Sequence, residues 1–154
     1  MINHQTQVTK LHRKVKFYLE QDEDGWPPET VETLWAKDVG GGMYEIDTIP
    51  FFVRGIAYKD VVFAEPSDEE LLFRKVVRPS GHNTIRIIFL DLAVKTQTCA
   101  ALEGKGCAWE GSHLDSLVSV DVPPSVCYND VKQLLVKGEE AGQWEYEEGC
   151  LSSE

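Results

Sequence analysis

The sequence lacks any long apolar run and is poor in basic residues for its size. No apolar segment approaches the ~20 residues that a membrane-spanning helix needs, and residues 1–10 lack the apolar stretch of a secretory signal peptide. The 154 residues include 15 lysines and arginines against 26 aspartates and glutamates, which gives a formal net charge of −11. This charge disfavours a nucleic-acid partner, because phosphate contacts need an excess of cations. We therefore expect a cytoplasmic protein that binds neither nucleic acid nor membrane.

Motifs of the common catalytic and metal-binding classes are also absent. The four cysteines contain no C-x-x-C pair, the four histidines show no zinc-ligand spacing with them, and no cofactor or metal is predicted. A chain without an export signal is expected to keep its thiols reduced, and the carboxylates near Cys150 disfavour its thiolate. There is no P-loop, G-x-G-x-x-G or G-x-S-x-G motif. These absences favour a non-enzymatic protein, with a triad assembled from distant positions as the alternative.

Residues 13–79 are predicted to form a β-rich half resembling a small β-barrel, because short strands alternate with turns rich in glycine and proline. Val15, Phe17 and Leu19 alternate with polar residues, which is typical of a half-buried strand. Residues 49–53 are apolar but contain a proline, which favours an edge or an irregular connection. The other predicted strands cover residues 31–39, for which a short helix is the alternative, 44–46, 60–65 and 71–77.

Residues 80–151 predict a different half, in which the order is strand, helix, strand, strand, helix, strand. This is the order of a ferredoxin-like βαββαβ unit, so the fold class is α+β with both halves packed as one globular unit. In the predicted sheet Arg86 and Ser119 point away from the helices, and their strand neighbours point toward them. Gly138 is expected to end the second helix. The predicted elements are strands 84–90, 107–110, 117–122 and 144–147, and helices from Asp91 and from about 125 or 129 to 137.

The densest polar cluster joins the two halves and is a possible ligand loop. Gly81 lets the backbone turn, Ser80 and Asn83 offer hydrogen bonds, His82 can carry a proton, and Arg86 can bind a carboxylate or phosphate. The alternative is a tight turn whose side chains satisfy their own backbone.

Acidic and aromatic residues mix near the C-terminus, which suits docking to a basic protein surface. The alternative is a solvated edge strand whose charges prevent aggregation. Trp26, in an acidic loop, has the same two interpretations, whereas Trp35 and Trp109 lie in predicted strands and are expected in the core. The candidate partner-binding residues are Glu139, Glu140, Trp144, Glu145, Tyr146, Glu147 and Glu148.

Several stretches are similar to a bacterial family, the domain of unknown function 4265 family. The resemblance covers nearly the whole chain after the first dozen residues, and it implies no activity and no catalytic residues. The stretches that carry it are Glu32–Ala36, Ile49–Phe52, Asp60–Val62, Ser80–Arg86, Trp109–Ser112, Val120–Pro124 and Tyr146–Leu151.

Two hypotheses of function follow from these patterns. The first is a cytoplasmic acidic protein-binding module, such as an immunity protein that neutralises a basic toxin by occluding its active site. The second is a small-molecule or nucleotide-handling enzyme or sensor, with a pocket at the loop from Ser80 to Arg86.

Overall fold

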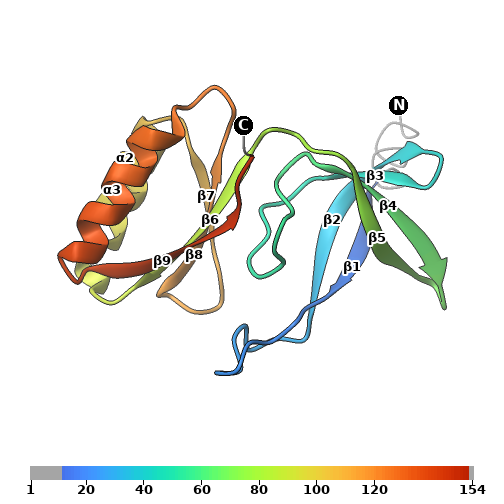
Figure 1. Ribbon diagram of the computed structural model, residues 1–154, viewed down its shortest axis with the longest axis horizontal. Coiled ribbons are helices and arrows are strands. Elements are labelled where there is room, and N and C mark those ends of the chain that lie inside the picture. Colours follow the sequence, from blue (N-terminus) through green and yellow to red (C-terminus); the bar gives the residue numbers. More distant parts are fainter. Residues whose placement is uncertain (1–11, 153–154) are drawn as a thin grey trace, which may run out of the picture.

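The computed structural model describes residues 12–152, which form two halves that lie side by side (Figure 1). The polar residues 1–10, on which the expectation of no signal peptide rests, lie outside the described residues. Over residues 12–152 the architecture is mixed α+β, mostly strands with two α-helices, which confirms the predicted class. Both α-helices cover the outer face of the C-terminal sheet, and its opposite face is turned toward the N-terminal half (Figure 1). In the described part of the chain, no helix is long and apolar enough to cross a bilayer.

The described part of the N-terminal half consists of five strands that pair in the order of their sequence. Neighbouring strands are antiparallel except β5 and β1, whose parallel contact of two residue pairs closes the ring. Register shifts between β2 and β3 and between β4 and β5 make the ring irregular. The strands are β1 (His12–Tyr18), β2 (Val31–Gly40), β3 (Met43–Ile46), β4 (Val61–Ser67) and β5 (Glu70–Arg78).

Alternation along β1 and β2 places one face of each strand in the core of this half. Val15 and Phe17 are buried, as predicted, and β2 is a strand and not a short helix because it pairs with both β1 and β3. The prediction that Trp35 lies in the core is wrong. Leu34 and Ala36 take the inward positions, so Trp35 is 49% exposed and packs under the ammonium group of Lys14, 5.0 Å from its ring.

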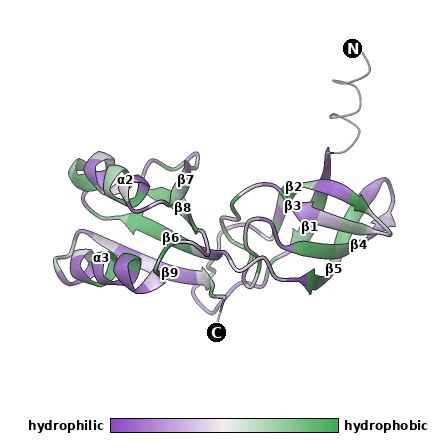
Figure 2. Cartoon of the chain, turned by 90° about the horizontal axis from the view of Figure 1, so that it is seen from above, coloured by the Kyte–Doolittle hydropathy of each residue, from purple (hydrophilic) through white to green (hydrophobic). Residues whose placement is uncertain are grey.

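The C-terminal half follows the predicted order of strands and helices. Its sheet has the order β7-β8-β6-β9, with every neighbouring pair antiparallel. In Figure 2 the two central strands of this sheet are coloured largely as hydrophobic. The elements are β6 (Asn83–Phe89), a short 3-10 turn η1 (Leu92–Val94), α2 (Lys95–Gly104), β7 (Ala108–Gly111), β8 (Leu117–Val122), α3 (Tyr128–Glu140) and β9 (Trp144–Cys150).

The predicted division of the sheet into two faces is confirmed. Alternate residues of β6 and β8 pack with Leu102 of α2 and Leu135 of α3 in one core, to which Trp109 adds a half-buried ring. Arg86 and Ser119 lie on the other face, where they contact the N-terminal half. The side chain of Asp91 accepts a hydrogen bond from the backbone of the following turn, as expected for a helix cap.

Helix α3 does not end at Gly138, as the sequence predicts, but continues to Glu140. Gly138 is buried against the indole of Trp144, at the start of β9. The lack of a side chain at Gly138 therefore lets β9 approach α3 closely, and the helix ends two residues later.

Candidate functional site

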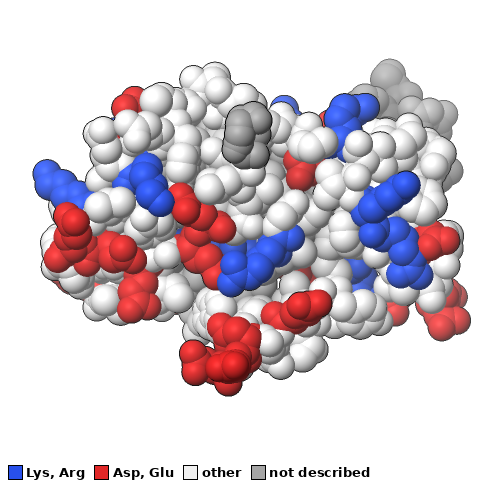
Figure 3. Space-filling view, in the orientation of Figure 1, with Lys and Arg blue, Asp and Glu red and all other residues white. Residues whose placement is uncertain are grey.

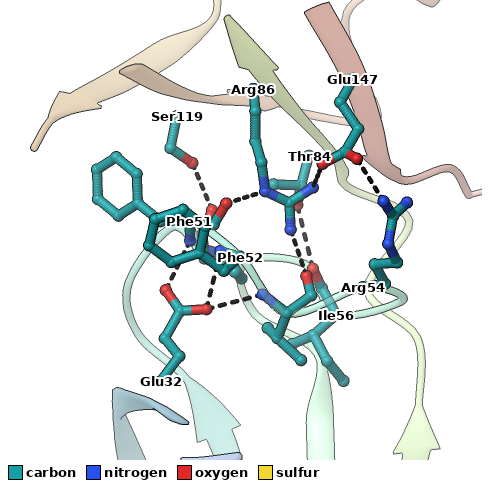
Figure 4. A network of polar contacts seen from close by, with 11 residues as sticks. Glu32, Phe51, Phe52, Arg54, Ile56, Thr84, Arg86, Ser119 and Glu147 are labelled. Atoms are coloured by element: carbon teal, nitrogen blue, oxygen red, sulfur yellow. Dashed lines mark hydrogen bonds and ion pairs between the residues drawn. The ribbon is translucent and has the colours of Figure 1, made fainter. Parts of the chain in front are cut away.

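The connection between β3 and β4 lies between the two halves, and the N-terminal half holds it through one carboxylate. The side chain of Glu32, on β2, accepts hydrogen bonds from the backbone N–H groups of Phe51, Phe52 and Val53 at 2.7, 3.0 and 2.8 Å (Figure 4). Three converging donors suit an ionised carboxylate. This loop forms no regular strand because these backbone N–H groups donate to a side chain and not to a neighbouring strand.

The C-terminal sheet holds the same loop from the opposite side. Arg86, only 2% exposed, donates to the carbonyl groups of Phe51 and Val53 (Figure 4). Its third contact is with the carboxylate of Glu147, at 3.0 Å. Burial lowers the pKa of the Arg86 guanidinium, and the charge of Glu147 opposes this shift. Ser119 and Thr84 add hydrogen bonds to further carbonyl groups of the loop.

The other residues of the predicted ligand loop also have partners within the chain. Ser80 donates to the carbonyl of Tyr58 at 2.7 Å, and Asn83 accepts from the backbone of Ser152. His82 lies 2.8 Å from the carboxylate of Asp121, whose pKa is raised by burial. A hollow of about 500 Å³ opens beside this junction, with His82 in its lining. Ser80 and Arg86 therefore bind the loop between the halves, whereas the hydrogen bonds of His82 and Asn83 lie within the C-terminal half.

The acidic stretch near the C-terminus divides between two faces of the sheet. Trp144 is 2% exposed, and its indole N–H donates to the carbonyl of Leu135, so it belongs to the core and cannot be a surface anchor. Glu148 accepts hydrogen bonds from Lys132, at 2.8 Å, and from Tyr128. These contacts lie on the helix side of β9.

The remaining members of the predicted set lie apart from one another. Tyr146 packs against the helix-side core, with the ammonium group of Lys132 5.2 Å from its ring centre. Glu139 and Glu140 are exposed at the C-terminal end of α3. Only Glu145 and Glu147 share the face that is turned toward the N-terminal half, because they pair with Ile88 and Arg86 of β6.

These two glutamates border a cleft of about 270 Å³ between the halves, which we name the acidic cleft. Its opposite wall is Trp26, from the loop that joins β1 and β2. The ring of Trp26 meets Phe52 edge-on, with 5.8 Å between the ring centroids. The carboxylate of Asp22 accepts from the backbone of Asp24 and of Trp26, both at 2.9 Å, which fixes the loop. The cleft is lined by Trp26, Arg86, Ile88, Glu145, Tyr146 and Glu147.

The charges around the cleft differ in how far they are neutralised. Glu147 receives two guanidinium groups, those of Arg86 and Arg54. Glu145 is exposed and forms no ion pair within residues 12–152. Figure 3 shows further acidic side chains at the lower edge between the halves, where Figure 1 places the loop joining β1 and β2. The cleft therefore offers an unpaired carboxylate near an indole, a combination that attracts an organic cation.

The sequence contains both walls of this cleft but no pattern that connects them. The sequence marks Trp26 and Glu145 separately as candidates for docking to a partner, but it does not connect them, because they lie in different halves. Among residues 12–152, the loop held by Glu32 and Arg86 joins the halves in this arrangement. Within the described residues, no group of three or more His, Cys, Asp or Glu side chains is placed to hold a metal ion.

The comparisons with known proteins place the chain in a family. A family model described as "Domain of unknown function (DUF4265)" matches residues 32–146. The chain belongs to the domain of unknown function 4265 family. The matched range includes Glu32, Arg86 and Glu145, whereas the loop carrying Trp26 precedes it.

A solved structure supports the same fold. It is described as "Novel crystal structure of a hypothetical protein from Neisseria gonorrhoeae", and it is 27% identical to this chain with a TM-score of 0.77. The similarity covers 92% of this chain and 96% of that one. None of the curated proteins matches the chain.

Two thiols of this family member, those of Cys107 and Cys150, are expected to be slow nucleophiles. Burial is the main cause that raises the pKa of Cys107 and of Cys150 to about 11, and the charges of Asp121 and Asp60 respectively add to it. A thiol with this pKa has a thiolate fraction about 100-fold lower at neutral pH than one near 9. We expect mass spectrometry after a short iodoacetamide treatment at pH 7.5 to find both unmodified, with the exposed Cys127 labelled first. Labelling of Cys150 as fast as Cys127 would contradict this.

Proposed function

We propose that this protein is a cytoplasmic, non-enzymatic module that binds a basic partner protein, with the acidic cleft as its point of contact. The single observation behind the proposal is the position of Glu145, an exposed carboxylate without an ion pair in the described residues, in the same cleft as the indole of Trp26. A lysine or arginine side chain entering there meets a carboxylate and an aromatic face together. Each contact is weak on its own, about 0–1 kcal/mol for an exposed ion pair and about 0.5–2 kcal/mol for a cation over a ring.

The rest of the surface charge acts at longer range. A net charge of −11 steers a cationic partner toward the protein and speeds association, an effect that salt suppresses. An immunity protein that covers the active site of a basic toxin is a special case of this proposal, in which the partner's own substrate site is cationic. A toxin and any other basic partner protein would make the same contacts in the cleft, so the two versions of the proposal differ only in the identity of the partner.

The proposal is tested with a defined cationic probe. A fluorescent peptide containing two arginines is titrated with the protein at low salt, and its binding is followed by anisotropy. We expect Glu145→Gln, which removes the charge but keeps the shape, to weaken binding about 3- to 5-fold, which corresponds to a loss of about 0.6–1 kcal/mol. The same peptide with citrulline in place of arginine is expected not to bind.

The matched control is Glu139→Gln, because Glu139 is an equally exposed glutamate that lies at the end of α3, outside the cleft. It changes net charge by the same amount and is expected to alter the affinity less than about twofold, as for a general charge effect. Equal losses in the two variants would show that only the overall charge matters. Absence of binding at low salt would reject the proposal.

The small-molecule alternative has weaker support. Its site is the hollow beside His82, yet the side chains of Ser80, His82, Asn83 and Arg86 each already contact another part of the chain. The peptide titration can be repeated in the presence of candidate metabolites to test this alternative. A metabolite that stabilises the protein without competing with the cationic peptide would favour it.

Two finer assignments of fold belong to this proposal. We propose that the N-terminal half is a small β-barrel, supported by the short parallel contact between β5 and β1. We propose that the C-terminal half is ferredoxin-like, supported by its βαββαβ order and the sheet order β7-β8-β6-β9.

A further inference from the structure

A second hollow opens next to the acidic cleft, at the end of β1, and four of its nine lining residues are aromatic. It has a volume of about 250 Å³, and we name it the aromatic groove. Tyr18 is its most accessible ring, with 68% of the residue exposed, and Phe73 stacks on Phe17 with 4.7 Å between the ring centroids. The lining residues are Phe17, Tyr18, Leu19, Glu20, Pro27, Phe52, Val53, Arg54 and Phe73.

The aromatic groove and the acidic cleft share a wall. Pro27 and Phe52 line the groove, and Trp26, the residue before Pro27, lines the cleft. The rings of Trp26 and Phe52 are in edge-to-face contact, so one aromatic pair separates the two hollows. Arg54 lines the groove and pairs with Glu147 of the cleft. A segment that lies across this wall reaches both hollows.

The two hollows differ in the side chains that they suit. The cleft presents Glu145, which has no ion pair among residues 12–152, whereas the groove presents aromatic rings and a proline, with Glu20 and Arg54 also in its lining. Aromatic-lined grooves recognise extended proline-containing segments, whose rings pack flat on aromatic faces and whose backbone is already ordered before binding. Such an ordered segment loses less conformational entropy on binding than a flexible one.

We propose that the partner of the acidic cleft is an extended, proline-containing segment, with its basic residue in the cleft and its proline in the aromatic groove. This inference rests on the proposed function, because it assumes that a basic residue enters the cleft. It adds a second requirement, that the basic residue be accompanied by proline.

The test uses two sets of labelled peptides of equal charge. In the first set, three consecutive prolines lie one to three residues before or after an arginine, and in the second, alanines replace the prolines. We expect the best proline peptide to bind about tenfold tighter than its alanine counterpart. Tyr18→Ala is expected to remove most of this difference and to leave the affinity for the alanine peptide within about twofold.

The control variant is Trp35→Ala, because Trp35 is another exposed aromatic residue of the N-terminal half, yet it lines neither hollow. It is expected to leave both affinities unchanged, and circular dichroism verifies that both variants are folded. If proline and alanine peptides bind equally while Glu145→Gln weakens both, the aromatic groove is not a binding site and the proposed function stands. If neither set binds at low salt, both proposals are overturned.

Discussion

Replacing Arg86 with methionine is expected to lower the free energy of unfolding by about 3–5 kcal/mol, because two carbonyl groups at the junction between the halves lose their charged donor. Methionine keeps much of the aliphatic volume, so the change isolates the guanidinium group. Without it, the carbonyl groups of Phe51 and Val53 lose this donor at the junction between the halves, and the carboxylate of Glu147 keeps Arg54 as an ion-pair partner. Each buried group left without a partner costs about 1–3 kcal/mol.

Urea denaturation measures this loss, as a lower midpoint with an unchanged slope if unfolding stays two-state. Arg86→Lys is expected to lose nearly as much, because a single ammonium group cannot reproduce the planar donor geometry of arginine. The matched control is Arg54→Met, which removes the other guanidinium group bound to Glu147. The side chain of Arg54 is 62% exposed, so its ion pair is worth at most about 1 kcal/mol. Similar losses for Arg54→Met and Arg86→Met would contradict the role assigned to burial.

The structure also shows groups within the chain that Arg86 binds and that the sequence does not indicate. Its position on β6, pointing away from the helices, follows from the alternation of the strand and was predicted correctly. A basic side chain on that face then suggested an anionic ligand. The groups that it binds are backbone carbonyls of the loop at residues 50–56, and carbonyl groups have no signature in a sequence.

Local patterns predicted the elements well, because strand alternation, turn residues and helix caps act over a few positions. The hairpin of β4 and β5 and both faces of the C-terminal sheet are of this kind. The acidic cleft is different, since it exists only where the two halves meet. Glu32, which holds the connecting loop through three N–H groups, lies in an ordinary strand pattern and carries no local signal of that role.

Glu147 contributes both to the stability of the junction between the halves and to the wall of the acidic cleft. This carboxylate takes one guanidinium group from the core of the junction and one from the surface, and it lies in the wall of the cleft next to Glu145. Because Arg54 and Arg86 already neutralise Glu147, Glu145 is the carboxylate left to bind an incoming cation. We therefore place the specificity of the cleft at Glu145 and assign Glu147 to holding the halves together.

Gly138→Ala is expected to lower the free energy of unfolding by about 3 kcal/mol, the upper end of the usual cost of overpacking. In a helix interior this substitution normally stabilises by up to about 1 kcal/mol, because alanine has the higher helix propensity. Here a Cβ atom would overlap carbons Cζ2, Cε2 and Cη2 of the buried Trp144 indole. Moving the ring away would also weaken its hydrogen bond to the carbonyl of Leu135, 3.0 Å away.

The matched control is Gly104→Ala, at the C-terminal end of α2, where a Cβ atom would meet no atom within 4 Å. The same substitution in the two helices is thus expected to change stability in opposite directions, with Gly104→Ala raising the unfolding free energy by some tenths of a kcal/mol up to about 1. Urea denaturation of the two variants measures the change in the free energy of unfolding for each, and therefore its sign. Stabilisation by Gly138→Ala would show that the strand and helix can separate without cost. In that case Trp144 would be free to leave the core, and its exclusion from the partner-binding surface would no longer hold.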